Sequence, residues 1–465
     1  MTRNKARLGL GSTYRAPEPG HRPREEGAES LHILVKTLVG ASLLALSACG
    51  ERELVLDGER FDVRQTAPPS SATELATRAF VAPAPVNYSS WTHRGGDASR
   101  NVTHPALATS LTQVFSVDIG AGNGRKQRLT ADPVVGNARI FTLDSASRVA
   151  ATSTSGSAIW SKDLIPASDK DRDASGGGLA LGPDAVYATT GFGELFSLDP
   201  ETGATMWRQK LEAPVTSAPT YSDGLVYVVT RDSRAWAIDA ANGRIRWQLT
   251  GAPSEATLIG GSGPLVAGRV AIVPFGSGEL VAALKRSGLR VWGSAVAGQR
   301  RGRAYANIFD ITGDPVFYDG TVYAANAGGR VVAISPASGQ RIWSANEGAY
   351  SPPLPVGDSL FMISEQGQLL RLDRETGERI WAERLPYFEN RKVRRRQAVY
   401  AHFGPVLAGG RLLVASNDGL IRSYDPADGT LLGTTPLRGG AASNPVIVDG
   451  TLYIVTENGQ LTAFR

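Results

Sequence analysis

The chain has 465 residues, of which 42% are hydrophobic and 53 are glycine, so it is long enough to bury a large core. It contains one cysteine, which excludes an internal disulfide framework. The formal net charge is +5, but the first 48 residues hold 7 Lys or Arg against 4 Asp or Glu, so the remainder is nearly balanced at 42 against 40. That balance gives no support for a nucleic-acid-binding protein.

The N-terminal residues predict an export signal. Residues 1–30 are rich in Arg, Pro, Gly and Glu without periodicity, which indicates a disordered extension. From His32 the sequence reads HILVKTLVGASLLALSAC, where a lysine precedes an apolar run that ends in small residues. This order is typical of a secretory signal peptide, and the run is too short for a membrane-spanning helix. We therefore interpret residues 1–48 as an extension followed by a signal peptide.

The pentapeptide LSACG at residues 46–50 resembles the lipobox of bacterial lipoproteins. The resemblance implies that Cys49 is lipidated and becomes the first residue of the mature chain. Gly50 follows it, which in this class implies sorting to the outer membrane. Two or more acyl chains anchor a protein stably, so the mature chain would stay membrane-bound. The alternative is a plain signal peptide followed by an incidental cysteine.

The next two segments lead into the folded domain. Residues 49–86 are polar and then rich in Ala and Pro, which predicts a flexible tether. In residues 87–107, Trp91 and the Gly95-Gly96-Asp97 turn predict an ordered lead-in that packs on one end of the domain, as either a lid or a tether. His93 and His104 lie in this stretch, but no third ligand is apparent, so we predict no metal site. Residues 111–119, LTQVFSVDI, read as a strand.

A repeat with a period of roughly 40 to 50 residues organises the rest of the chain. Its pattern, G-x-L-x-x-L-D-x-x-T-G-x-x-x-W, is fullest in GELFSLDPETGATMW at residues 193–207. Each copy has a glycine four residues before a tryptophan, and a seventh copy has Gly433 where the tryptophan should be. The pairs are Gly156 with Trp160, Gly203 with Trp207, Gly243 with Trp247, Gly288 with Trp292, Gly339 with Trp343 and Gly377 with Trp381.

Each unit predicts four short antiparallel strands. In SAPTYSDGLVYVVT an apolar run is followed by Asp223-Gly224, which supplies the positive φ values of a tight hairpin turn, and then by alternating Val and Tyr. The third strand reads LFSLD, Thr-Gly makes the next turn, and the fourth strand carries the tryptophan. One such sheet cannot bury both faces alone, so we expect the units to stack as propeller blades with the tryptophan between them.

The unit count predicts how the propeller closes. Seven units carry four strands, and the eighth begins at Asn444-Pro445 and stops at Arg465 after three. We predict that residues 111–119 supply the missing strand, with Phe115 near the tryptophan position, because closure removes an open sheet edge. The expected fold is all-β, an eight-bladed β-propeller of four-stranded antiparallel blades over residues 87–465.

Inserts between the blades are the natural places for function on a rigid scaffold. Residues 162–178 include Asp169, Asp171 and Asp173, which alternate as in a calcium loop without the rest of that motif. Residues 251–264 form a connection rich in small residues. Residues 298–315 form a connection that combines Arg with aromatic residues. Residues 386–402, PYFENRKVRRRQAVYAH, hold a basic run at 391–396. Such a run is either a solvated face or a contact surface for phosphate, lipid head groups or an acidic protein.

The repeat resembles the PQQ-like repeat of quinoprotein propellers, and no Trp-Asp pair ends a strand as it does in WD repeats. One branch of that superfamily, the PQQ-dependent dehydrogenases, has an adjacent Cys-Cys pair beside the quinone and a calcium site. No cysteine follows Cys49, and no convincing group of carboxylates lies at loop positions. We therefore predict no catalytic residue, no cofactor and no metal.

The lipobox, tether, eight units and closing strand together resemble the BamB family of outer-membrane lipoproteins. Members of this family dock the core β-barrel assembly subunit (BamA-like) through two loops on one face, after blades three and four. In the first loop Leu258 keeps an apolar residue, whereas Ile259 replaces an arginine of the family. In the second, Asp310 keeps an acid, the second acid is missing, and Arg303 could supply the lost positive charge. The corresponding partner-binding positions are Ala256, Leu258, Ile259, Arg303, Asp310 and Thr312.

The resemblance implies a non-catalytic scaffold lipoprotein at the periplasmic side of the outer membrane. Its partners would be the core subunit, other assembly lipoproteins and unfolded outer-membrane precursors, which could pair with its outer strands by β-augmentation. Two alternatives stay open: a PQQ-dependent dehydrogenase, and a periplasmic propeller that binds a small ligand in its central channel.

Overall fold

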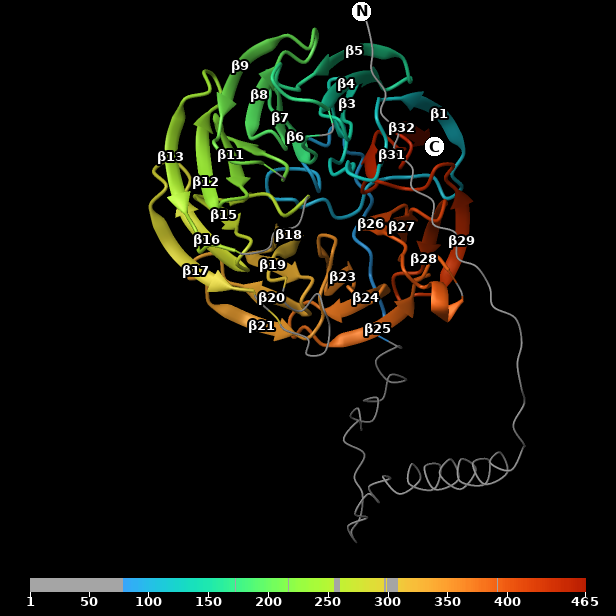
Figure 1. Cartoon of the computed structure of the whole chain (residues 1–465). Helices are drawn as coiled ribbons and strands as arrows, with labels where there is room; N and C mark the ends of the chain where they lie inside the picture. Colours follow the sequence, from blue (N-terminus) through green and yellow to red (C-terminus); the bar gives the residue numbers. More distant parts are fainter. Residues whose placement is uncertain are drawn as a thin grey trace, which may run out of the picture. The chain divides into compact units, whose positions relative to one another are not determined.

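The computed structural model describes residues 78–465 except 172, 216, 255–259, 297, 299–307 and 391. The predicted signal peptide, Cys49 and most of the expected tether lie outside these residues. The described chain forms eight four-stranded antiparallel sheets that succeed one another around a ring (Figure 1). The predicted all-β, eight-bladed propeller is confirmed.

The first four blades follow the chain from residue 134. Blade 1 contains β2 (Val134–Gly136), β3 (Arg139–Leu143), β4 (Arg148–Ser153) and β5 (Ala158–Asp163). Blade 2 contains β6 (Gly177–Leu181), β7 (Val186–Thr190), β8 (Glu194–Leu198) and β9 (Thr205–Lys210). Blade 3 contains β10 (Thr220–Ser222), β11 (Leu225–Thr230), β12 (Arg234–Asp239) and β13 (Ile245–Thr250). Blade 4 contains β14 (Leu265–Ala267), β15 (Val270–Pro274), β16 (Glu279–Leu284) and β17 (Arg290–Ala295).

The remaining blades complete the ring. Blade 5 contains β18 (Ile311–Tyr318), β19 (Thr321–Asn326), β20 (Arg330–Ile334) and β21 (Arg341–Ala345). Blade 6 contains β22 (Leu354–Val356), β23 (Ser359–Ile363), β24 (Gln368–Asp373) and β25 (Arg379–Arg384). Blade 7 contains β26 (His402–Ala408), β27 (Arg411–Ser416), β28 (Leu420–Tyr424) and β29 (Leu431–Pro436). Blade 8 contains β30 (Val446–Val448), β31 (Thr451–Val455), β32 (Gln460–Phe464) and β1 (Gln113–Asp118). A short 3-10 helix, η2 (Val393–Arg395), precedes blade 7.

Blade 8 closes the ring with both ends of the propeller sequence. Strand β1 pairs antiparallel with β32, and Phe115 stands opposite Ala463 with a bulge beside it. Trp160 stands opposite Ala151 in blade 1 in the same way. Phe115 therefore takes the tryptophan position of blade 8, as predicted.

The repeated glycine and tryptophan are the two halves of a contact between neighbouring blades. Trp160 Nε1 donates a 3.1 Å hydrogen bond to the Pro200 carbonyl of blade 2, and a Cβ on Gly203 would stand 2.6 Å from the Trp160 ring. Only a residue without a side chain lets the turn lie this close to the indole, and the φ of +72° at Gly203 also favours glycine. The other five tryptophans of the repeat donate the same kind of hydrogen bond to the next blade. Their acceptors are the backbone carbonyl oxygens of Ala240, Lys285, Pro336, Arg374 and Pro426.

The exception at Gly433 follows from the closure. In this position of β29 an indole would face the turn between the third and fourth strands of blade 8. Blade 8 has no such turn, because its third strand is β32 near the C-terminus and its fourth is β1. A tryptophan at 433 would have no turn to dock on.

The apolar core is divided among the spaces between the blades. The buried apolar residues form eight clusters, one between each pair of neighbouring blades. The blade 1–blade 2 cluster, for example, joins Phe141 and Val149 to Leu179 and Phe196. Stacking thus buries both faces of each sheet, as the repeat requires. In the described part of the chain, no helix combines the length and apolar character of a membrane span.

Candidate functional site

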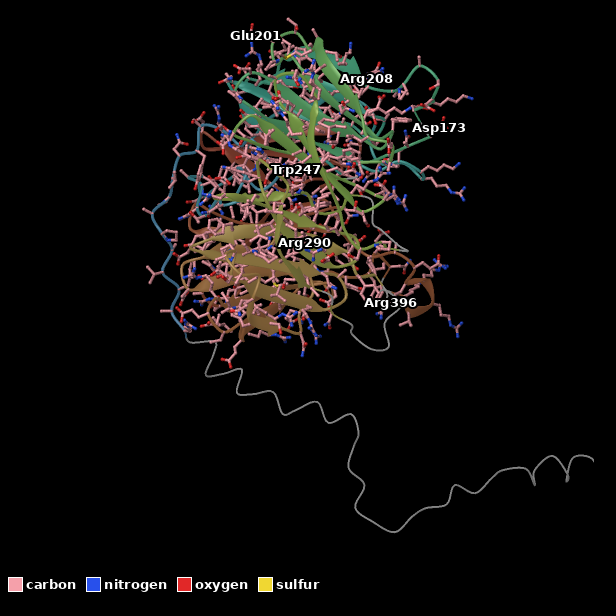
Figure 2. The ribbon with its side chains drawn as sticks, turned by 90° about the vertical axis from the view of Figure 1, so that its left-hand side faces the viewer. Asp173, Glu201, Arg208, Trp247, Arg290 and Arg396 are labelled. Atoms are coloured by element: carbon pink, nitrogen blue, oxygen red, sulfur yellow. The ribbon has the colours of Figure 1, made fainter. Side chains whose placement is uncertain are left out.

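The antiparallel order of the strands gives the propeller two different faces. Connections that leave one blade and enter the next lie on one face, which we call the loop face, and the turn between a blade's third and fourth strands lies on the other. Figure 2 shows the difference: Asp173 and Arg396, both in connections between blades, project to one side, whereas Glu201, in a turn within blade 2, lies toward the other. The long inserts therefore share one face.

The opposite face is crossed by an N-terminal strap, residues 78–110, that follows the left-hand side of the ring in Figure 2. It contacts every blade, largely through backbone hydrogen bonds. The predicted lead-in on one end of the propeller is thus confirmed. The contacts, from blade 1 to blade 8, are Trp91 with Val135, Thr92 with Leu181, His93 with Tyr221, Ala98 with Val266, Ser99 with Phe317, Arg78 with Asp373, His104 with Gly410, and Tyr88 with Asp449.

The strap begins to pack earlier in the sequence than the expected start of the domain at residue 87. Arg78 forms an ion pair with Asp373, and Phe80 packs edge-on against Phe361 at 5.3 Å between ring centroids. The buried guanidinium of Arg371 donates to the carbonyl oxygens of Arg78 at 2.8 Å and Ala79 at 3.2 Å. Residues 78–86, expected as the end of the tether, are therefore held against blade 6 and its neighbours.

Two strap arginines neutralise two aspartates at the centre of the ring. Arg94 Nε lies 3.0 Å from Asp314 Oδ2 and 3.5 Å from Asp132 Oδ2, and Arg100 lies 3.4 Å from Asp314 Oδ1. All four side chains are largely buried, and the Asp314 side chain is fully so. Each buried charge has an opposite charge beside it and further hydrogen bonds. Asp132 and Asp314 therefore help to hold the strap in place at the centre of the ring.

This packing leaves a small cavity beside the strap. The cavity between the strap residues Trp91, Arg100 and Val102 and the first strands of blades 5 to 8 has a volume of about 50 Å³.

The two histidines of the lead-in have structural partners. His93 Nε2 lies 3.0 Å from the backbone nitrogen of Tyr221, and burial, with the nearby Arg100 charge, lowers the pKa of His93 to about 4. His104 Nδ1 lies 2.6 Å from the Pro83 carbonyl oxygen, while its Nε2 accepts from the backbone N–H of Gly410. Among residues 78–465, leaving aside the undescribed positions, no three His, Cys, Asp or Glu side chains are grouped to hold a metal ion.

The predicted docking positions are partly visible. Ala256, Leu258, Ile259 and Arg303 lie outside the described residues. Asp310 and Thr312 are buried at 4% and 6% exposure, and the Thr312 hydroxyl donates to the Ala349 carbonyl oxygen. Neither side chain faces solvent, whereas the neighbouring Phe309 is 39% exposed.

The described ends of the two predicted docking loops lie close together. Gly261 and Ser262 of the first connection and Asp310 and Ile311 of the second line one cavity of about 40 Å³ on the loop face. Gly260, the residue before Gly261, has its carbonyl oxygen 3.4 Å from a guanidinium nitrogen of Arg94 in the strap. The described ends of both connections therefore border the same small cavity.

Sequence reasoning missed the channel charges. Arg94, Arg100 and Asp132 lie in loops and Asp314 lies in β18, without a recognisable spacing. The available signal was the Asp-Pro pair at Asp132, just ahead of β2, and again at Asp314, within β18. Two identical pairs entering blades 1 and 5 could have pointed to two carboxylates facing the axis.

These features define a class, a closed propeller of the quinoprotein type whose own N-terminal strap fills its axis. Its fold is similar to the quinohemoprotein alcohol dehydrogenase of Comamonas testosteroni, with a TM-score of 0.61, 16% identity and coverage of 81% of this chain and 80% of that one. It is likewise similar to the crystal structure of BamB from Moraxella catarrhalis, with a TM-score of 0.63, 20% identity and coverage of 77% and 100%. At these identities the likenesses concern the fold alone.

The sequence comparisons are more specific. The family model described as outer membrane protein assembly factor BamB matches residues 119–383 and 392–465. A curated relative with that description, from Moranella endobia (strain PCIT), is 23% identical over 358 residues, covering 76% of this chain and 89% of the relative. The chain therefore belongs to the BamB family.

Proposed function

We propose that this chain is a non-catalytic scaffold of the outer-membrane β-barrel assembly machinery, held at the periplasmic side of the outer membrane by lipid on Cys49. The observation that carries the proposal is the family match across residues 119–383 and 392–465, together with relatives described as assembly factors. The geometry suits the role, because a rigid ring presents its inserts on one face and holds the strap on the other.

The proposed docking surface for the core subunit (BamA-like) consists of the two connections at residues 251–264 and 298–315. Phe309 is exposed at its described edge, and aromatic residues are frequent anchors in interfaces. Asp310 and Thr312 would act by fixing the shape of the second loop, since both are buried. Ala256, Leu258, Ile259 and Arg303 complete the proposed surface, and other assembly lipoproteins and unfolded precursors complete the proposed set of partners.

Co-purification tests this proposal. Outer membranes are solubilised gently, the chain is recovered through a C-terminal tag, and its partners are identified by mass spectrometry. We expect near-stoichiometric recovery of the assembly subunits, and a loss of about tenfold in recovery for Phe309→Arg or Leu258→Arg, as for truncation of an interface anchor. Asp310→Arg is less informative, because reversing a buried charge also tests folding.

The matched control is Leu289→Arg. Leu289 is 66% exposed in the turn before β17, on the face opposite the loop face, so this variant carries the same kind of change away from the proposed surface. Recovery of the chain alone from membranes with an intact assembly core would contradict the scaffold role. Equal recovery for Phe309→Arg, Leu258→Arg and Leu289→Arg would remove the two loops from the docking surface.

The absence of catalysis is part of the same proposal. It is supported by the lack of any cysteine beyond Cys49, which rules out the Cys-Cys pair of the PQQ-dependent dehydrogenases. Purified chain supplied with PQQ and calcium should give no quinone absorbance shift and no dye reduction with alcohol substrates. Substrate-dependent dye reduction would overturn this part.

A further inference from the structure

The insert between blades 6 and 7 forms a projecting element that the scaffold role does not explain. Residues 387–400, which we call the basic hairpin, fold back on themselves: Phe388 pairs with Val399, Tyr400 N donates to the Tyr387 carbonyl at 2.9 Å, and Glu389 N donates to the Ala398 carbonyl at 3.2 Å. The 3-10 helix η2 forms its tip. The family match leaves out residues 384–391, which include the first part of the hairpin.

The hairpin concentrates positive charge in solvent. Lys392, Arg394, Arg395 and Arg396 are all exposed, and Glu389 is the one carboxylate in its sequence. Arg396 lies over the Phe388 ring at 4.7 Å from its centroid. Backbone hydrogen bonds hold the hairpin together, and the mutual repulsion of these cations favours binding of negative charge.

Apolar and aromatic side chains continue from the hairpin onto the loop face. Tyr350 is 50% exposed, Val399 47% and Phe388 37%. A cavity of about 310 Å³ opens beside them at the base of the hairpin. Its wall has aromatic and aliphatic residues on the hairpin side, Tyr350, Ile363, Tyr387, Val399, Tyr400 and Phe403. Polar and charged residues, among them Arg94, Glu365, His402 and Asn444, complete it.

We propose that the basic hairpin and this cavity bind an extended acidic segment of a partner protein, with an aromatic side chain of that segment in the cavity. The four exposed cations complement acidic residues, and the cavity accepts one ring that a flexible chain can insert. A flat lipid surface would meet the hairpin tip but would not reach the cavity at its base, which favours a polypeptide. The site lies between blades 6 and 7, apart from the docking loops near blades 3 to 5. Its test therefore does not depend on the proposed function.

Binding of a synthetic peptide to the purified full chain in detergent tests the proposal. The probe is a fluorescein-labelled peptide in which several Asp and Glu residues flank a single tryptophan, followed by fluorescence anisotropy. We expect binding that weakens as salt is raised, since exposed charges are screened. The double variant Arg394→Glu with Arg395→Glu should bind about tenfold or more weakly, and so should a peptide with alanine in place of the tryptophan.

The matched control is the double variant Arg125→Glu with Lys126→Glu. These neighbouring cations are also exposed and lie in the connection from β1 to β2 on the same loop face, so the charge change is identical but the location differs. This variant should bind the peptide like the unaltered chain. Equal weakening by both double variants would show a general charge effect and overturn the proposed site.

Two other results would also overturn it. The first is absence of peptide binding at low salt. The second is capture of the chain by phosphatidylglycerol-containing vesicles, lost in the Arg394→Glu, Arg395→Glu variant, without binding of the peptide; this would assign the hairpin to an anionic lipid surface. Equal affinity for the tryptophan and alanine peptides would remove the aromatic anchor from the proposal.

Discussion

Gly243 lies directly against the indole of Trp207 in the preceding blade: a Cβ added to Gly243 would stand 2.7 Å from Trp207 Cε3. The same contact recurs around the ring, with Gly156 against Phe115 at the closure and Gly429 against Trp381. Each repeat therefore supplies one flat ring and one turn without a side chain, and consecutive repeats fit together. This is why the two residues recur with a fixed spacing in a sequence that otherwise varies.

Gly243→Ala should destabilise the propeller more than an equivalent change in an open turn. The new methyl group must displace the indole, which adds about 1–3 kcal/mol of overpacking to the cost of an L-residue at φ +73°. Gly224→Ala is the control, because its φ is +77° and nothing lies within 4 Å of the added Cβ. It should cost only about 1–2 kcal/mol. Urea unfolding of both variants measures the difference, and equal losses would show that the indole contact is not tight.

The exceptional Gly433 should tolerate a tryptophan. Nothing lies within 4 Å of a Cβ at this position, and blade 8 offers no turn for an indole to dock on, so Gly433→Trp should change stability by less than about 0.5 kcal/mol. Trp247→Ala, which removes an 8% exposed ring and its 2.9 Å hydrogen bond to Lys285, should cost about 3–5 kcal/mol. Thermal unfolding compares the two, and clear stabilisation by Gly433→Trp would mean that blade 8 has an acceptor after all.

The sequence was enough to predict the ring and an ordered lead-in on one end of it, but not the path of the strap. The Gly-Trp pair and the Asp-Gly turn each need particular residue types, as at Gly203 with Trp207 and at Asp223 with Gly224. Their period therefore reveals the blades, and with Phe115 it reveals the closing strand. The strap is held mostly by backbone groups, as where Leu181 N donates to the Thr92 carbonyl. Backbone contacts leave no residue signature, so its path across all eight blades could not be predicted from the sequence.

The candidate docking site was predicted less fully for a related reason. The position of the two loops was predicted by counting blades, and the structure places Ser262 and Asp310 on one cavity. Burial of Asp310 and Thr312 could not be anticipated, because a polar residue in a connection is usually exposed. Exposed Phe309 was visible in the sequence only as one apolar residue among several.

Arg371→Met should loosen the start of the strap. Arg371 is fully buried, and its guanidinium holds the carbonyl oxygens of Arg78 and Ala79 and lies over the Phe80 ring at 5.3 Å. Loss of two hydrogen bonds at about 1 kcal/mol each should raise local opening of residues 78–82 by roughly tenfold or more. Trypsin cleavage after Arg78, followed by mass spectrometry, reads this out.

The control for the strap experiment is Arg384→Met at the exposed end of β25. It removes the same charge without touching the strap, so cleavage after Arg78 should stay at the unaltered rate. Equal cleavage rates in Arg371→Met and the unaltered chain would show that the strap is held by other contacts, such as the ion pair of Arg78 with Asp373.

Stability should depend on His93 as the pH falls. Burial, and secondly the charge of Arg100, lower the pKa of His93 from 6.5 to about 4 in the folded chain. The unfolded chain then binds more protons between these values, so stability is full above pH 6.5, falls as the pH drops toward 4, and levels off below it. The total for this group is about 3 kcal/mol. Urea unfolding of the unaltered chain and of His93→Gln at several pH values isolates the contribution, because glutamine does not titrate. The difference in unfolding free energy between the two should shrink as the pH falls from 6.5 to 4, and a constant difference across that range would mean that His93 titrates equally in both states.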